Sequence, residues 1–320
     1  MNGNRFLVLD GWRGISILMV LAAHLLPLGP QSWQLNATAG PLGMALFFTL
    51  SGFLITHSLY GNPSVKIFII RRVFRIVPLA WLYFAISFLF IPTNTESMKA
   101  LLFFYANWPP MDFTLITTHI WSLCVEMQFY LGIAVIVLLI GKKGLGLIPV
   151  LCLCITLNRI HADVTIAVNT YYRVDEILIG GVLALFYNSP KTYIVHVLER
   201  LNPLYILLLL VISCHPESGF LGYLRPYFAA LLVAVTLYNS QSNLTKVLLI
   251  KPLSYLAVIS YALYVIHPIL NHGWLGEGDS IEKYLKRPFL FIILFLLAHM
   301  STFYYEKHWI TWAKRITTKT

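Results

Sequence analysis

Arg13 and His24, in the first apolar stretch of the chain, have the residue types and the spacing of a reaction centre. The stretch covers residues 9–28 (LDGWRGISILMVLAAHLLPL) and approaches the length of a membrane span. Eleven residues make close to three helical turns, so both side chains fall on one helix face, about 16 Å apart along its axis. This places a fixed cation near one membrane surface and a titratable imidazole deep in the span. A neutral imidazole can act as a general base, and a guanidinium binds anions.

Glu126 is the only acid in a later apolar stretch, WSLCVEMQFY. A carboxylate near a histidine can orient the imidazole and raise its basicity. We expect His24 about 6 Å and Glu126 about 10 Å inside the outer ends of their helices. The alternative is that each side chain makes an ordinary hydrogen bond between helices. Because burying such groups in a membrane is costly, we favour a functional role for both.

A basic cluster at residues 69–78 (IIRRVFRIVP) contains Arg71, Arg72 and Arg75. We expect it to open a helix at the cytoplasmic surface. Arg72 and Arg75 are three residues apart, and Arg71 and Arg75 are four apart, so they are neighbours on the helix. Such a cluster suits a ligand with several phosphates. Ordinary positive flanking of a span, or contact with anionic lipid headgroups, explains the spacing equally well.

The composition indicates an all-α, polytopic membrane protein. Of the 320 residues, 58% are apolar and only 11% are charged, whereas a soluble domain has about 25% charged residues. We predict about ten transmembrane helices in one helical bundle, with residues 1–320 forming a single membrane domain. The predicted helices cover residues 10–28, 42–61, 73–92, 119–140, 145–158, 173–188, 201–214, 226–240, 252–271 and 289–308. We predict no cleaved signal peptide, because charged residues interrupt the first apolar run and no cleavage site follows it.

The distribution of charge predicts the orientation. With both termini in the cytoplasm, sixteen of the 23 Lys and Arg residues fall on the inner side. The net charge of +10 is therefore explained by flanking of the spans, and we expect no nucleic-acid partner.

The four cysteines lie in or beside apolar spans, and their spacing predicts neither a metal site nor a disulfide framework. Loops at 29–41, 93–118, 159–172 and 272–288 then face outward, and their tryptophans (Trp33, Trp108, Trp274) either stack on sugars or belong to the interfacial belt, which we favour for any one of them.

Two further motifs have structural interpretations. Ser51 and Gly52, in FFTLSGFLIT, are small residues that permit close helix packing, and nothing around Ser51 resembles a serine-hydrolase elbow. Arg173 could bind a sugar or an acid, or it could pair with Asp175 or Glu176. We favour pairing.

Taken together, the motifs resemble those of the acyltransferase-3 family of integral membrane acyltransferases, which includes O-antigen, exopolysaccharide and nodulation-factor O-acetyltransferases. The resemblance covers nearly the full length. It is carried, in order, by LDGWRGISILMVLAAH, LFFTLSGFLIT, RRVFRIVP, WSLCVEMQFYL, RVDEILIGGVLA, SYALYVIH and YYEKHW.

This resemblance implies a bundle of about ten helices that transfers an acyl group, usually acetyl, from cytoplasmic acyl-CoA to a glycan hydroxyl outside the cytoplasm. His24 matches the family's essential histidine and Arg13 its paired arginine. Arg72 and Arg75 match its Arg-x-x-Arg pair, and Glu126 its helix-borne acid. Family members often carry an additional C-terminal hydrolase-like domain, and we expect none here, because the chain stops soon after Trp312.

We therefore predict an acetyl-CoA-dependent O-acetyltransferase in the bacterial inner membrane, without a metal. Its acceptor would be a glycan or lipid-linked sugar of the cell envelope, such as O-antigen, lipopolysaccharide or exopolysaccharide. The predicted catalytic residues are His24, Glu126 and Arg13, and the CoA phosphates would lie by Arg71, Arg72 and Arg75. Two rivals remain: a transporter of a lipid-linked sugar or small anion, against which the absence of an inverted repeat counts, and a non-catalytic partner in polysaccharide assembly.

Overall fold

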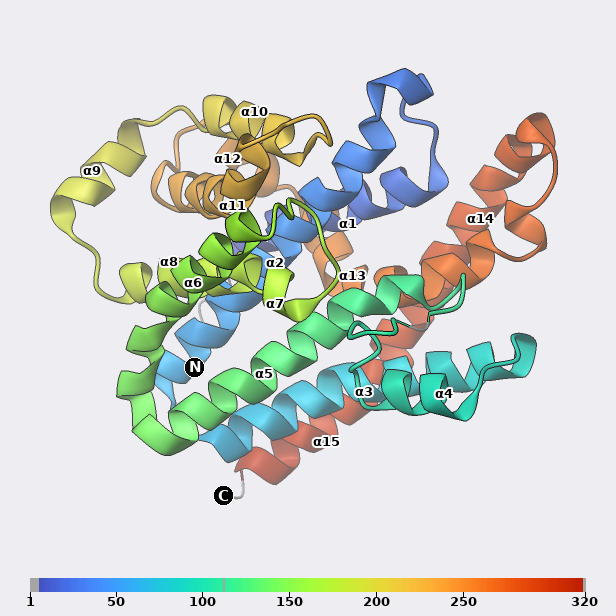
Figure 1. The fold of residues 1–320 in the computed structure, drawn as a ribbon, viewed down its shortest axis with the longest axis horizontal. Helices are drawn as coiled ribbons and strands as arrows, with labels where there is room; N and C mark the ends of the chain where they lie inside the picture. The colour runs from blue at the N-terminus through green and yellow to red at the C-terminus, as the bar shows by residue number, and fades with distance from the viewer. Residues whose placement is uncertain (1–5, 112, 319–320) are drawn as a thin grey trace. The chain divides into compact units, whose positions relative to one another are not determined.

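The computed structural model describes residues 6–111 and 113–318, and within them it contains helices and no strands (Figure 1). The α-helices are α1 (Leu7–Leu25), α2 (Leu35–Gly61), α3 (Val65–Phe90), α4 (Thr95–Leu102), α5 (Trp121–Ile140), α6 (Ile148–His161), α7 (Thr170–Arg173), α8 (Asp175–Asn188), α9 (Thr192–Arg200), α10 (Pro203–Cys214), α11 (Leu221–Tyr238), α12 (Asn243–Leu248), α13 (Lys251–Asn271), α14 (Ser280–Met300) and α15 (Lys307–Thr318). A π-helical turn, η5 (Ser301–Glu306), joins α14 to α15.

The fold class is that of a polytopic helical membrane protein, as predicted. Among the described residues, seven segments are long and apolar enough to cross a membrane, and there is an eighth if α9 and α10, bent by 84°, form one span. The expected number was about ten. The difference arises because Thr118–His161 is one helical segment of 44 residues that contains both α5 and α6. In addition, α8 with 14 residues and α10 with 12 are shorter than the roughly 20 residues that a bilayer requires.

Two helices that carry predicted site residues have different boundaries from those expected. Helix α1 ends at Leu25, because Leu26 precedes a proline and is extended, with φ −123° and ψ 147°. Helix α3 begins at Val65 rather than at residue 73, and the Ser64 side chain caps it by accepting a hydrogen bond from the Ile67 amide. The arginine cluster therefore lies inside α3 and not at its first turn.

The chain folds into two compact units. The first comprises the described residues of Met1–Pro63, Ile140–Ala167 and Tyr171–Val258, and the second those of Ser64–Leu139, Val168–Thr170 and Ile259–Thr320. Arg13 and His24 belong to the first unit. The arginine cluster and Glu126 belong to the second.

Glycines hold the helices of the first unit close together. A β carbon on Gly52 of α2 would lie 1.7 Å from the Ile177 carbonyl oxygen of α8, and one on Gly180 would lie 2.0 Å from the Thr49 carbonyl oxygen. Gly43 likewise lets α2 approach the backbone of α1 at Ser16. The prediction that Gly52 serves close packing is thus confirmed, and α1, which carries His24, packs against α2.

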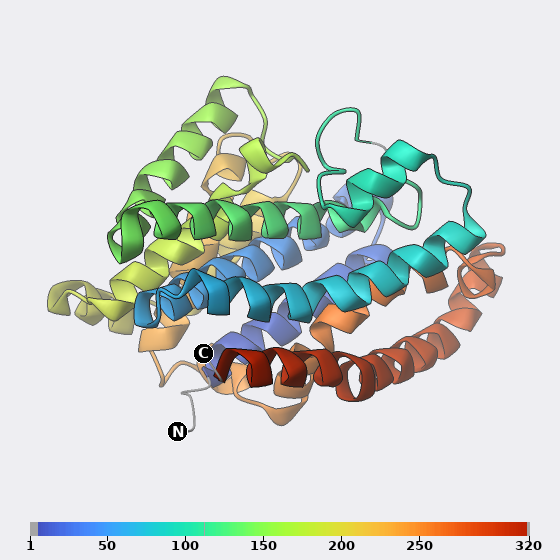
Figure 2. The same ribbon diagram turned by 90° about the horizontal axis from the view of Figure 1, so that it is seen from below.

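In the second unit, α15 runs beside α3 (Figure 2). Phe74 of α3 packs edge-on against Trp312, with ring centroids 4.6 Å apart. The Tyr305 hydroxyl donates a hydrogen bond to the Pro78 carbonyl at 3.2 Å. The Tyr261 hydroxyl of α13 donates to the Ile76 carbonyl at 2.6 Å. These contacts fix the rotation of α3 and therefore the directions of its arginines.

Candidate active site

Helix α1 positions Arg13 and His24 as the spacing predicted. Its rotation is set by Trp12, whose indole N–H donates to the Thr236 hydroxyl at 2.8 Å. Gly11 adds to this, because a β carbon there would lie 2.2 Å from the Leu248 carbonyl oxygen. Arg13 is half-buried and His24 is exposed.

The expected depth of His24 was wrong. The helix ends one residue after it, at Leu25, so the imidazole lies in the last turn rather than about 6 Å inside the span. The reason is Pro27, which forces the residue before it out of helical geometry.

Asn36 is a residue that the sequence reasoning missed, and it secures the helix end that carries His24. Its side-chain amide donates to the carbonyls of Ala23, at 2.9 Å, and Leu26, at 2.7 Å. Its oxygen accepts from the Leu28 amide at 3.3 Å. These bonds satisfy carbonyls that every helix C-terminus leaves without a partner inside the helix. The sequence signal, an asparagine in a predicted outer loop, is too common to single it out.

In the second unit, Glu126 and Arg72 belong to one cluster. The Tyr130 hydroxyl donates a hydrogen bond to the Glu126 carboxylate. The Arg72 guanidinium lies 5.9 Å from the centroids of the Tyr130 and Phe68 rings, and it interacts electrostatically with Glu126. A signal for Tyr130 was available, because residues four apart on a helix are neighbours.

This cluster corrects the expectation that the arginines open their helix. Arg72 is the eighth residue of α3, about 10 Å from the start of the helix. Arg71 points elsewhere: its Nε donates to the Thr317 hydroxyl of α15 at 3.1 Å. The three arginines therefore do not form one surface patch, and Arg72 lies near an acid that we expected in the opposite half of the membrane.

Arg75 interacts electrostatically with another acid of the second unit, Glu306. Glu306 ends the π-helical turn and is buried. It accepts hydrogen bonds from the hydroxyls of Ser301, at 3.0 Å, and Thr302, at 3.1 Å. Such π-helical turns occur frequently at functional sites. The sequence reasoning gave Glu306 no role, although it is the only acid between residues 289 and 308. Arg72, Arg75, Glu126 and Glu306 thus bring two basic and two acidic side chains together within the second unit.

The first unit contains a separate cluster of buried charges. Arg159 pairs with Asp175 at 2.6 Å. Glu176 accepts from Arg225 at 2.7 Å and pairs with Arg173 at 3.2 Å. All five side chains are at most 2% exposed. The predicted pairing of Arg173 with a neighbouring acid is confirmed, whereas Arg159 and Arg225 were not expected to join it.

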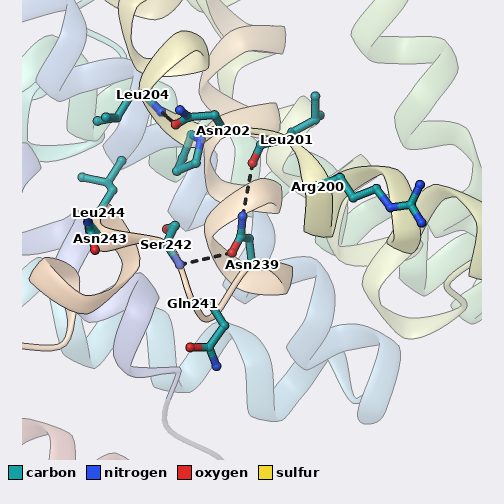
Figure 3. A pocket seen from close by; sticks show the side chains of 10 residues that line it. Arg200, Leu201, Asn202, Leu204, Asn239, Gln241, Ser242, Asn243 and Leu244 are labelled. Atoms are coloured by element: carbon teal, nitrogen blue, oxygen red, sulfur yellow. Dashed lines mark hydrogen bonds between the residues drawn. The ribbon is translucent and has the colours of Figure 1, made fainter.

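One cavity of about 410 Å³ lies where α9 turns into α10, beside the loop that leads into α12. Figure 3 shows that Asn239 donates to the Leu201 carbonyl across it and that the Arg200 side chain points away from the amides. The residues that line it include none of the predicted site residues. Within the described part of the chain, no group of three or more His, Cys, Asp or Glu side chains could hold a metal ion.

The chain is similar in sequence to several proteins that are named as O-acetyltransferases. The chain is 26% identical over 307 residues to a Staphylococcus aureus (strain COL) protein named "Putative O-acetyltransferase", covering 81% of this chain and 49% of that protein. It is 27% identical over 348 residues to the Bacillus subtilis "Putative peptidoglycan O-acetyltransferase YrhL", covering 93% and 54%. It is 26% identical over 317 residues to the Listeria monocytogenes peptidoglycan O-acetyltransferase OatA, covering 82% and 49%.

The chain thus spans about half the length of these curated relatives. No solved structure matches it. The model of the acyltransferase domain of the acyltransferase 3 family matches residues 6–305. The match includes Arg13, His24, Arg71, Arg72, Arg75 and Glu126. This chain therefore belongs to the acyltransferase 3 family of membrane proteins.

Proposed function

We propose that the protein is a membrane O-acetyltransferase that moves an acetyl group from acetyl-CoA to a hydroxyl of a cell-envelope glycan. The observation that carries the proposal is the Arg13–His24 pair on one helix, α1, whose rotation and C-terminal end are fixed by Trp12 and Asn36. The family membership and the names of the relatives support the reaction type.

Peptidoglycan is the acceptor that we favour, because two of the relatives are named for it. The expectation of O-antigen or lipopolysaccharide has no support among them. We retain the bacterial inner membrane as the location and both termini in the cytoplasm, on the distribution of Lys and Arg.

In the proposed reaction, His24 accepts the proton of the acceptor hydroxyl, whose oxygen attacks the thioester carbonyl. The carbon–sulfur bond then breaks, and the CoA thiolate leaves and takes up a proton. Arg13 stabilises the negative charge that develops during attack. In a variant of this scheme, His24 first takes the acetyl group itself and passes it to the hydroxyl.

Arg72 and Arg75 would bind the phosphates of CoA, whereas Arg71, which bonds to Thr317, would contribute little. A role for Glu126 follows from its contacts in the second unit: through Tyr130 it balances the charge of Arg72 and holds it in place. The other role, orientation of the imidazole, predicts a different result for Glu126→Gln. Loss of arginine positioning raises the KM for acetyl-CoA, whereas loss of imidazole orientation lowers kcat.

The proposal is tested by mass spectrometry of envelope glycans from a deletion strain that carries wild-type protein or His24→Ala. We expect O-acetyl groups to be lost on deletion and restored by wild type but not by an equally expressed variant. Equal restoration by both would exclude His24 as the catalytic base. It would favour a transport or assembly role.

A further inference from the structure

The loop after α4 is held rigidly by a network of buried side-chain amides. Asn107 is fully buried and donates to the Val168 carbonyl at 3.0 Å and the Thr170 hydroxyl at 2.9 Å. Gln128 of α5 donates to the Asn107 side chain and to the Phe104 carbonyl, each at 2.8 Å. All of these groups belong to the second unit. The network anchors an irregular segment to the helix that also carries Glu126.

The network ends on Trp108. The Trp108 N–H donates to the Gln128 side-chain oxygen at 2.9 Å, yet the residue remains 49% exposed. Backbone bonds on both sides, from Trp108 to the Tyr105 carbonyl and from Met111 to the Trp108 carbonyl, fix the turn. Tyr105 in the same turn is 44% exposed.

The Trp108 N–H is bonded to Gln128, so a ligand at this half-exposed residue would meet the indole ring rather than the N–H. The ring is also pre-organised, because the amide network removes the rotational freedom that binding would otherwise cost. The charge distribution predicts that this loop, within residues 93–118, faces outward.

We propose that Trp108, with Tyr105 beside it, is the platform on which the acceptor glycan stacks. The C–H groups on one face of a pyranose carry partial positive charge and pack against the electron-rich face of an aromatic ring. Gln128 is a positioning residue for this platform. It lies on α5, the helix that also carries Glu126. This inference rests on the proposed function and names the acceptor-binding surface for it.

The test uses purified full-length protein and a fluorescent, un-O-acetylated peptidoglycan tetrasaccharide, with binding followed by anisotropy. We expect Trp108→Ala to weaken binding at least tenfold and Trp108→Phe, which keeps an aromatic face, by less than threefold. Trp81→Ala is the matched control. Trp81 is 48% exposed, and its N–H donates to the Leu102 carbonyl at 3.1 Å, but it lies on α3, a candidate span. We expect no change in this variant.

Steady-state kinetics with the same tetrasaccharide separate this role from a structural one. Trp108→Ala should raise the KM for the glycan and leave kcat and the KM for acetyl-CoA within twofold, with an unchanged unfolding temperature. Three results would overturn the platform: Trp81→Ala weakens tetrasaccharide binding as much as Trp108→Ala does, Trp108→Ala binds it unchanged, or the wild type does not bind it. If the wild type binds the glycan through Trp108 but transfers no acetyl group, the proposed reaction fails and the platform stands. If Trp108→Ala transfers acetyl groups normally and its KM for the glycan is unchanged, the platform fails and the proposed reaction stands.

Discussion

Arg71 and Arg72 are adjacent in the sequence but make different contacts, so we predict different effects on the acetyl donor. Arg72→Ala should raise the KM for acetyl-CoA about tenfold, because a charge-assisted bond contributes roughly 1.5–3 kcal/mol and because Glu126 and Tyr130 lose their cation. Arg71→Ala is the control. It removes an exposed residue that bonds to Thr317, and the KM should change less than threefold. Equal effects in the two variants would show that the cluster acts as a surface patch.

Asn36 should affect catalysis without touching the substrate. Asn36→Asp keeps an oxygen for the Leu28 amide but loses the donors to the Ala23 and Leu26 carbonyls, and its negative charge faces a helix C-terminus. We therefore expect a kcat at least tenfold lower, with little change in the KM for acetyl-CoA. Asn36→Ser, which retains a donor, should recover part of the rate. If Asn36→Asp has the kcat of the wild type, Asn36 does not support catalysis through the end of α1.

At the residue scale, the sequence predicts what helical periodicity controls. The common face of Arg13 and His24 follows from their spacing on one helix, and the Glu126–Tyr130 contact follows from a spacing of four. The bond from Trp12 to Thr236 joins residues 224 positions apart. No local sequence pattern predicts such a bond, and none predicts the hydrogen bonds of Asn36 to the end of α1.

At the scale of elements, the buried ion pairs join α6, α8 and α11 in the first unit. Asp175→Asn would leave Arg159 buried at 1% exposure without its counter-charge, and such a loss costs about 3–5 kcal/mol. The unfolding temperature of the purified protein should fall accordingly. The double variant Arg159→Met with Asp175→Leu removes both charges and should recover most of the loss. A double variant as unstable as Asp175→Asn would show that the hydrogen bonds of Arg159 to the Thr165 and Gly222 carbonyls, rather than charge balance, hold these helices.

Helix existence was predictable and helix ends were not. Each predicted span corresponds to a helix, because a helix satisfies all the backbone hydrogen bonds of a long apolar run within the run itself. The start of α3 was missed because Lys66, Arg71 and Arg72 interrupt the apolar run, although charged residues do not end a helix. That error placed the arginines at the first turn of the helix rather than inside it.

At the scale of the molecule, the distribution of the site residues between two units could not be read from the sequence. Each unit is assembled from segments far apart in the chain, and hydrophobic periodicity identifies which face of a helix is buried without identifying its partner. Gly52 and Gly180 show this limit. The sequence indicates close packing at Gly52, and only the structure shows that α8 is the helix that approaches it.

The most direct test of the account measures transfer itself. Purified protein in lipid vesicles receives acetyl-CoA labelled in the acetyl group together with the peptidoglycan tetrasaccharide. We predict label in the glycan and one CoA released for each acetyl group transferred. Transfer should be at least 10²-fold slower in His24→Gln, as expected for the loss of a general base. Transfer by His24→Gln at the wild-type rate would contradict the central claim.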